Sequence, residues 1–281
     1  MKISISCALA LLGLLLLPTV VYAAAPGADE IIRRSQTLDS GKDLFSRLTF
    51  TIETRDGEHK KFTLLMAYKN YAGEKGVQSK VIMFNQYPPD TRDVSFMAWL
   101  YTPALQKKDD MWLYLPQLRT VRKLSHHHDP HHHKKDNEDE FSLSELQRFE
   151  LQPRDITLDR HKLAALETLD GRETYKVVST PIDPASSRYA SMVRWITSDD
   201  YLPVRIDYLD QSGRTVKRQT IAWTRIGDAW LWEEVSAVNL QTGNRTQLRQ
   251  SDIKVNRGLP DNVFTKRFMK RGAGTLLAKI K

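Results

Sequence analysis

The sequence predicts a mainly β protein with a few helices, built as an antiparallel sheet. Roughly ten or eleven short segments are rich in aromatic and β-branched residues, and turn residues separate them at regular intervals. Helical periodicity occurs at only three places. The chain lacks the alternation of strands and helices that builds parallel sheets. We therefore expect an antiparallel meander in one domain.

The first 23 residues are predicted to be a secretory signal peptide. Lys2 supplies the positive charge, residues 8–21 form a short apolar run, and Val21-Tyr22-Ala23 fits a cleavage site. The run is too short and too broken for a membrane span. Cys7, the only cysteine, lies inside it, so the mature chain, residues 24–281, has no disulfide or thiol chemistry. We expect a soluble protein of the bacterial periplasm.

The remaining elements are predicted in chain order from periodicity and turn residues. An amphipathic helix is expected at residues 29–39. Strands are expected at 44–54, 59–69, 80–84, 95–101 and 111–115, and Asp56-Gly57 forms a hairpin turn between the first two. A short helix at 141–149 precedes strands at 163–169, 174–180, 190–197, 204–209, 215–225, 230–240 and 246–255. A last helix is expected at 260–270.

Several of these strands are apolar on both faces. Trp230 and Trp232 point one way, while Leu231 and Val235 point the other. A sheet with one solvated face would alternate cleanly. Two explanations stay open here: helices cover one face as a filled core, or the sheet curls around a hydrophobic content.

Residues 112–125, WLYLPQLRTVRKLS, are the most informative segment. Trp112 and Tyr114 share one face of a strand, and Pro116 ends its ladder because proline has no N–H to donate. A basic, amphipathic stretch follows, in which Arg119, Arg122 and Lys123 alternate with Leu118, Val121 and Leu124. If the sheet holds these apolar residues, the three cations share a rim that can meet anionic headgroups. The alternative is a charged edge that prevents pairing between molecules.

This segment resembles the signature of the outer-membrane lipoprotein-sorting proteins, which are similar to the periplasmic carriers LolA and LolB. Three further stretches fit: residues 88–92 with 96–99, residues 140–146, and residues 258–265 with Arg271-Gly272. Asp93 stands where that family has glycine, and a His-rich insert replaces a Gly-Ser pair before Phe141. The resemblance implies an antiparallel sheet curled into an unclosed half β-barrel, with a helical lid over an apolar cavity.

The resemblance also implies a function. It predicts a non-catalytic carrier of lipid or lipoprotein acyl chains, in transient contact with membranes and with an inner-membrane exporter of the resistance-nodulation-division type. The expected cargo-binding residues are the aromatic residues of the strands: Phe96, Trp99, Trp112, Tyr114, Trp195, Trp230 and Trp232. The formal net charge of +8 is mixed along the chain, which does not favour nucleic-acid binding.

The insert, residues 126–140, supports an alternative function. Its imidazoles are good ligands for zinc or nickel: His126, His127, His128, His131, His132 and His133. They are interpreted either as a polar loop with adventitious metal affinity or as the centre of a periplasmic metal-buffering protein. No cofactor is required under the carrier hypothesis.

Catalytic motifs are missing from the sequence. It contains neither the Gly-x-Ser-x-Gly elbow of serine hydrolases nor a His-Glu-x-x-His zinc motif. His59 and His161 stand alone among charged neighbours. A carboxylate pair of the glycosidase type cannot be recognised from spacing, so Glu233-Glu234 stays a candidate for a hydrolase. We expect that the protein is not an enzyme.

Overall fold

The computed structural model describes residues 26–124, 144–147, 150–151 and 153–279. The predicted signal peptide and the His-rich insert lie outside these ranges. Within them, no helix is long and apolar enough to cross a membrane.

The described residues form thirteen strands, all in one antiparallel sheet. The first six are β1 (Asp43–Glu53), β2 (His59–Asn70), β3 (Val77–Tyr87), β4 (Ser95–Tyr101), β5 (Asp110–Leu115) and β6 (Thr120–Lys123). The others are β7 (Asp159–Leu169), β8 (Arg172–Pro181), β9 (Ser191–Thr197), β10 (Pro203–Leu209), β11 (Thr215–Ile226), β12 (Ala229–Asn239) and β13 (Arg245–Val255). The order in the sheet is β6-β5-β4-β3-β2-β1-β13-β12-β11-β10-β9-β8-β7.

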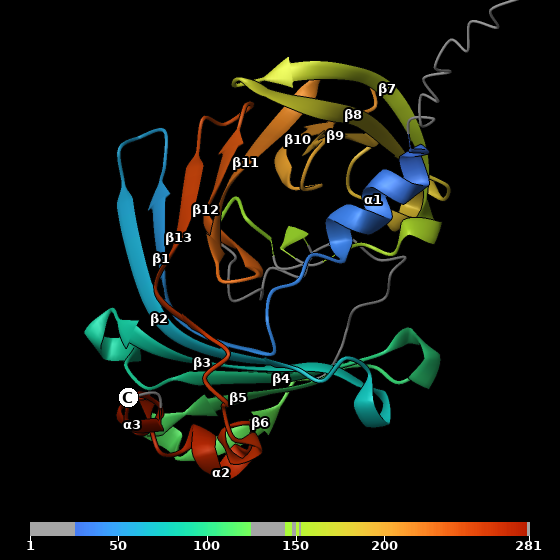
Figure 1. The fold of residues 1–281 in the computed structure, drawn as a ribbon. Helices are drawn as coiled ribbons and strands as arrows, with labels where there is room; N and C mark the ends of the chain where they lie inside the picture. Colours follow the sequence, from blue (N-terminus) through green and yellow to red (C-terminus); the bar gives the residue numbers. More distant parts are fainter. Residues whose placement is uncertain (1–25, 125–143, 148–149, 152, 280–281) are drawn as a thin grey trace, which may run out of the picture.

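The sheet curls strongly, and its two edge strands, β6 and β7, do not pair (Figure 1). The predicted unclosed half-barrel is therefore confirmed. Register defines one continuous concave face, because cross-strand partners point to the same side. Along one row of that face, Leu64 pairs with Leu48, Leu48 pairs with Gln250, and on the next row Leu248 pairs with Val235.

The helices divide between the two faces of the sheet. Helix α1 (Ala28–Gln36) lies inside the curve, and its buried Ile31 and Ile32 pack against Val177 of β8 and Ile196 of β9. Helices α2 (Lys266–Met269) and α3 (Ala273–Lys279) lie on the convex side of β3–β6 (Figure 1). Of the described helices, only α1 therefore covers the concave face as the predicted lid would.

Two aspartates attach the C-terminal segment to the sheet. The buried carboxylate of Asp43, at the start of β1, accepts backbone N–H bonds from Arg257, Gly258 and Leu259 at 2.8, 2.9 and 3.2 Å. Asp93 accepts the N–H of Ala273 at 3.0 Å. Asp93 has a φ of 64°, the left-handed region that favours glycine and that aspartate tolerates. Asp93 thus adopts a backbone conformation that suits glycine, and its carboxylate also binds the C-terminal segment.

Three local predictions differ from the structure. Residues 120–123 form strand β6, which the sequence had suggested only as a basic stretch. The predicted helix at 260–270 is broken into a 3-10 turn, Asp261–Val263, and α2, whose N-terminus Thr265 caps through its side chain. Residues 145–146 are bends and residues 144 and 147 are irregular, so the described part of the predicted helix at 141–149 is not helical.

Candidate functional site

The concave face of β2–β4 carries a set of apolar side chains that are only partly buried. We call it the concave apolar surface; it comprises Phe62, Leu64, Met66, Val81, Met83 and Leu100. These residues lie on one side of neighbouring strands, since Met66 pairs with Met83 and Val81 with Ala98. A continuous apolar strip that keeps some exposure can receive an apolar ligand without rearranging the sheet.

Leu146 crosses this face from an irregular segment. Its side chain is 0% exposed and packs among Leu48, Phe50 and Val235. The segment is held in place because the N–H of Glu145 donates to Thr246 Oγ1 at 2.9 Å. Part of the concave face is therefore already filled by the chain itself.

The structure divides the predicted cargo-binding aromatics between the two faces. Phe96 packs against Ala98 and Met111 on the concave side. Trp232 packs against the concave cluster around Val235, and Trp230 lies on the same side of β12. These three residues remain compatible with the predicted role.

The other four aromatics lie on the convex face. Trp99, Trp112 and Tyr114 pack in the core beneath the C-terminal helices. The indole N–H of Trp99 donates to the Phe264 carbonyl at 3.2 Å, and its ring meets Trp112 edge-on at 5.4 Å. Trp195 lies beneath the Arg205 guanidinium, 4.3 Å from the ring centre. All four therefore pack away from the concave apolar surface.

The concave face of β8–β11 carries buried polar groups beside the apolar residues that contact α1. Lys217 and Glu150 form a buried ion pair, with side chains 5% and 1% exposed. Tyr189 donates its hydroxyl to Glu150 at 3.0 Å, and the Lys217 ammonium lies 4.9 Å from the ring centre of Tyr208. Burial lowers the pKa of Lys217 and raises the pKa of both tyrosines. This group joins the loop at residue 150 to the sheet.

A second polar group lies further along, on β8 and β9. The Nε–H of Arg154 is shared between the two carboxylate oxygens of the buried Asp159, at 3.1 and 3.0 Å. Arg194 donates to Ser179 Oγ at 2.5 Å, and His161 Nδ1 lies 2.8 Å from the same oxygen. Burial lowers the pKa of the Arg194 guanidinium. Sequence reasoning missed this group, although an arginine inside the apolar run MVRWI was a usable signal.

The predicted rim cations lie on the edge hairpin β5–β6. Arg119 is in the turn with a φ of 49°, Arg122 faces the concave side opposite Leu113, and Lys123 faces the convex side opposite Trp112. Lys123 pairs with Asp110 at 2.5 Å. The apolar residues between them also split: Val121 packs under the C-terminal helices, Leu124 packs on the concave side, and Leu118 is exposed. The cations share an edge but not one face.

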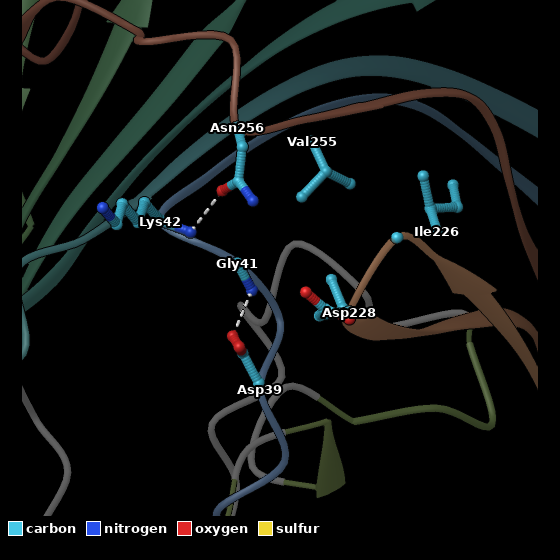
Figure 2. Close-up of a pocket in the computed structure, with 9 residues that line it drawn as sticks. Asp39, Gly41, Lys42, Ile226, Asp228, Val255 and Asn256 are labelled. Atoms are coloured by element: carbon cyan, nitrogen blue, oxygen red, sulfur yellow. Dashed lines mark hydrogen bonds between the residues drawn. The ribbon is translucent and has the colours of Figure 1, made fainter.

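A pocket of about 380 Å³ lies at one end of the half-barrel (Figure 2). The linker after α1, the β11–β12 turn and the end of β13 line it. The N–H of Gly41 donates to Asp39 at 2.8 Å, and the N–H of Lys42 donates to Asn256 Oδ1 at 2.7 Å. A side chain at Gly41, whose φ is 84°, would collide with Val255. The polar groups hold these loops together, and the lining does not include the concave apolar surface.

Metal and catalytic chemistry find little support in the described residues. The six predicted metal-binding histidines lie outside them, and the part of the chain that the structure describes has no group of three or more potential metal ligands. Glu234 is on the convex face and pairs with Arg249 at 2.9 Å, so it is part of a surface ion pair. His161 is engaged by Ser179 and the Ile156 carbonyl.

Solved structures share this architecture. A domain from Vibrio parahaemolyticus named for outer membrane lipoprotein sorting is 23% identical, with a TM-score of 0.69 over 87% of this chain and 98% of that one. A DUF1329 family protein from Desulfovibrio piger is 22% identical, with a TM-score of 0.69 over 86% and 97%. A LolA superfamily protein from Nitrosomonas europaea is 18% identical, with a TM-score of 0.58 over 87% and 100%.

The fold is thus LolA-like, as the sequence resemblance predicted. A family model described as "uncharacterized protein" matches residues 77–271, and the chain belongs to that family. No curated protein matches the chain.

Proposed function

We propose that the protein is a non-catalytic periplasmic carrier of lipid, or of the acyl chains of a lipoprotein. The observation that carries the proposal is the concave apolar surface, because it lines the inside of a sheet that does not close. Exposing a C16 chain to water costs on the order of 12 kcal/mol, from about 0.8 kcal/mol per methylene. A carrier therefore needs an apolar concavity that cargo can enter and leave.

The unpaired edges support the same proposal. In a closed barrel, backbone hydrogen bonds between strands would have to break to admit an acyl chain from the side. The sheet here is open between β6 and β7, so an acyl chain can enter without breaking any of them. Within the predicted set, Phe96, Trp230 and Trp232 would contact cargo together with the concave apolar surface. The exporter partner and the transient membrane contact implied by the resemblance belong to this proposal.

The test places a charge on the concave apolar surface. Leu64→Glu should weaken binding of a fluorescent acyl probe at least tenfold, because the carboxylate would have to be desolvated against the chain. Thr63→Glu is the matched control, since the adjacent side chain points to the convex face and should change the affinity less than twofold. Native mass spectrometry of protein purified without detergent should show bound lipid near one per chain. If the parent protein shows no saturable acyl binding, the carrier hypothesis is wrong.

A further inference from the structure

A single leucine covers the middle of an apolar row that crosses the concave face. By register, the row takes one residue from each of the neighbouring strands β2, β1, β13, β12 and β11: Phe62, Phe50, Leu248, Val235 and Ile221. The three middle residues are 3%, 1% and 3% exposed, whereas the two at the ends are only partly buried. Leu146 packs in the same cluster. The apolar floor is therefore continuous, and the segment around Leu146 divides it.

Side chains of three strands fix this segment through hydrogen bonds to Glu145. Thr246 of β13 accepts its backbone N–H at 2.9 Å, the Lys217 ammonium of β11 donates to its carbonyl at 2.8 Å, and Asn239 of β12 donates to its carboxylate at 3.2 Å. The N–H of Leu146 donates to Ser144 Oγ at 2.9 Å, so the next backbone group is bonded as well. The sheet itself therefore determines where Leu146 lies.

A second apolar row, on β2–β5, has the length of one acyl chain. By register, it consists of Leu113, Phe96, Met83 and Met66. Three steps between neighbouring strands, each about 4.8 Å, make this row about 14 Å long. One acyl chain in a membrane spans about 15 Å, because two of them fill the hydrocarbon core of about 30 Å. The row begins beside the edge strand β6, and at its other end Met83 and Met66 pack against the cluster that contains Leu146.

We propose that Leu146 is the stop that limits the length of the acyl chain in the concave site. This inference rests on the proposed function and names the property by which the site selects its cargo. The chain lies along the row from β5 to β2, and its methyl end meets Leu146. A methylene beyond that point stays in water and adds no affinity, because the hydrophobic gain is proportional to the apolar area removed from water.

The experiment measures the affinity of fatty acids as a function of chain length. Saturated fatty acids from decanoate to arachidate, in steps of two methylenes, displace a fluorescent acyl probe from the mature protein. In the parent protein, each methylene should raise the affinity about fourfold, the equivalent of about 0.8 kcal/mol, up to a limiting length beyond which longer chains bind no tighter.

Variants of Leu146 should move this limit in both directions. Leu146→Ala removes three carbon atoms of the stop, so the limit should become about two methylenes longer. The first acid beyond the parent's limit should then bind about 15-fold tighter than it binds the parent, from about fourfold for each of two methylenes. Leu146→Phe enlarges the stop and should make the limit shorter.

Two matched variants separate a stop from a residue that only fills the core. Leu65→Ala removes the same atoms from a leucine that is also 0% exposed but packs on the convex face, beneath the C-terminal helices. It should keep the limit of the parent. Leu146→Met keeps the volume of the side chain and should keep this limit too. If Leu146→Ala does not fold, a shorter limit for Leu146→Phe beside an unchanged one for Leu146→Met still decides the question.

Three results would overturn the inference. A limit that is the same in the parent and in the alanine and phenylalanine variants would make Leu146 a filler of the core. A gain by the same factor at every chain length in Leu146→Ala would make the segment a lid that cargo displaces. A parent affinity that keeps rising through arachidate would show that the site has no stop. In each case the carrier proposal stands, whereas a parent that binds none of the acids removes both.

Discussion

Replacing Asp43 by asparagine tests how the C-terminal segment is held to the sheet. One carboxylate oxygen, Oδ1, accepts the N–H of Arg257, and the other, Oδ2, accepts the N–H groups of Gly258 and Leu259. An asparagine has a single acceptor oxygen, so it can replace only one of the two. Its amide nitrogen then faces a backbone donor, and at least one N–H loses its partner.

The expected loss follows from these contacts. An unsatisfied buried N–H costs about 1–3 kcal/mol, and each remaining bond changes from charge-assisted to neutral at a cost of roughly 1 kcal/mol. Asp43 is 4% exposed, so water can replace few of the hydrogen bonds that are lost. We expect Asp43→Asn to lower the free energy of unfolding by about 3 kcal/mol. The α2 and α3 amides should exchange hydrogen faster than those of β1.

Chemical denaturation with a fitted slope measures the change. Asp252→Asn is the control: its side chain is 58% exposed and its ion pair with Arg47 is a surface one, expected to contribute about 0–1 kcal/mol. A loss below about 0.5 kcal/mol for Asp43→Asn, or one no larger than the control's, would show that this carboxylate does not anchor the segment.

Two further predictions concern the edge hairpin β5–β6. Hydrogen bonding from Lys123 holds the pKa of Asp110 well below its usual range, so its contribution is complete above about pH 3.9 and is lost as pH falls toward the folded pKa. The stability gap between the parent and Asp110→Asn should therefore shrink as pH falls below about 3.9, and a constant gap down to about pH 2 contradicts the assignment. Replacing Arg119, Arg122 and Lys123 by glutamine should weaken cosedimentation with anionic liposomes, with about 1 kcal/mol lost per cation, and raised salt should mimic it. Unchanged liposome binding at low salt would leave these residues a role in solubility or edge protection alone.

The positions of most strands along the chain were predictable because strand periodicity and turn chemistry are local. The pairing of β1 with β13 was not, because the predicted meander pairs only neighbours in sequence. Asp56-Gly57 marks the turn between β1 and β2, and the observed strands begin and end within a few residues of the expected ones. Strand β6 was not predicted, because its charged residues, which suit an exposed sheet edge, obscure the alternation that marks a strand. The predicted helix at 260–270 is interrupted at Thr265, whose extended backbone and capping side chain start α2 afresh.

The candidate site was predictable only in part. Alternation establishes that Trp112 and Tyr114 share a face and that Phe96 lies on the other side from Met97. It does not reveal which face becomes concave, because that depends on how thirteen strands curl together. The pairing of Lys217 with Glu150 was likewise not predictable, since it depends on a loop that folds back over a distant strand.

The seam between β1 and β13 has a consequence for how the molecule assembles. Every other pair of neighbours in the sheet is consecutive in sequence, so each can form from a local hairpin. At the seam, Leu44 must find Val255, which lies near the opposite end of the chain. Contacts between distant residues carry the largest loop-closure cost and slow folding. We expect two curved half-sheets to form first and the seam to close last. Strand β1 would then keep one unpaired edge until β13 has been synthesised, which makes this strand the place where a helper protein would be needed most.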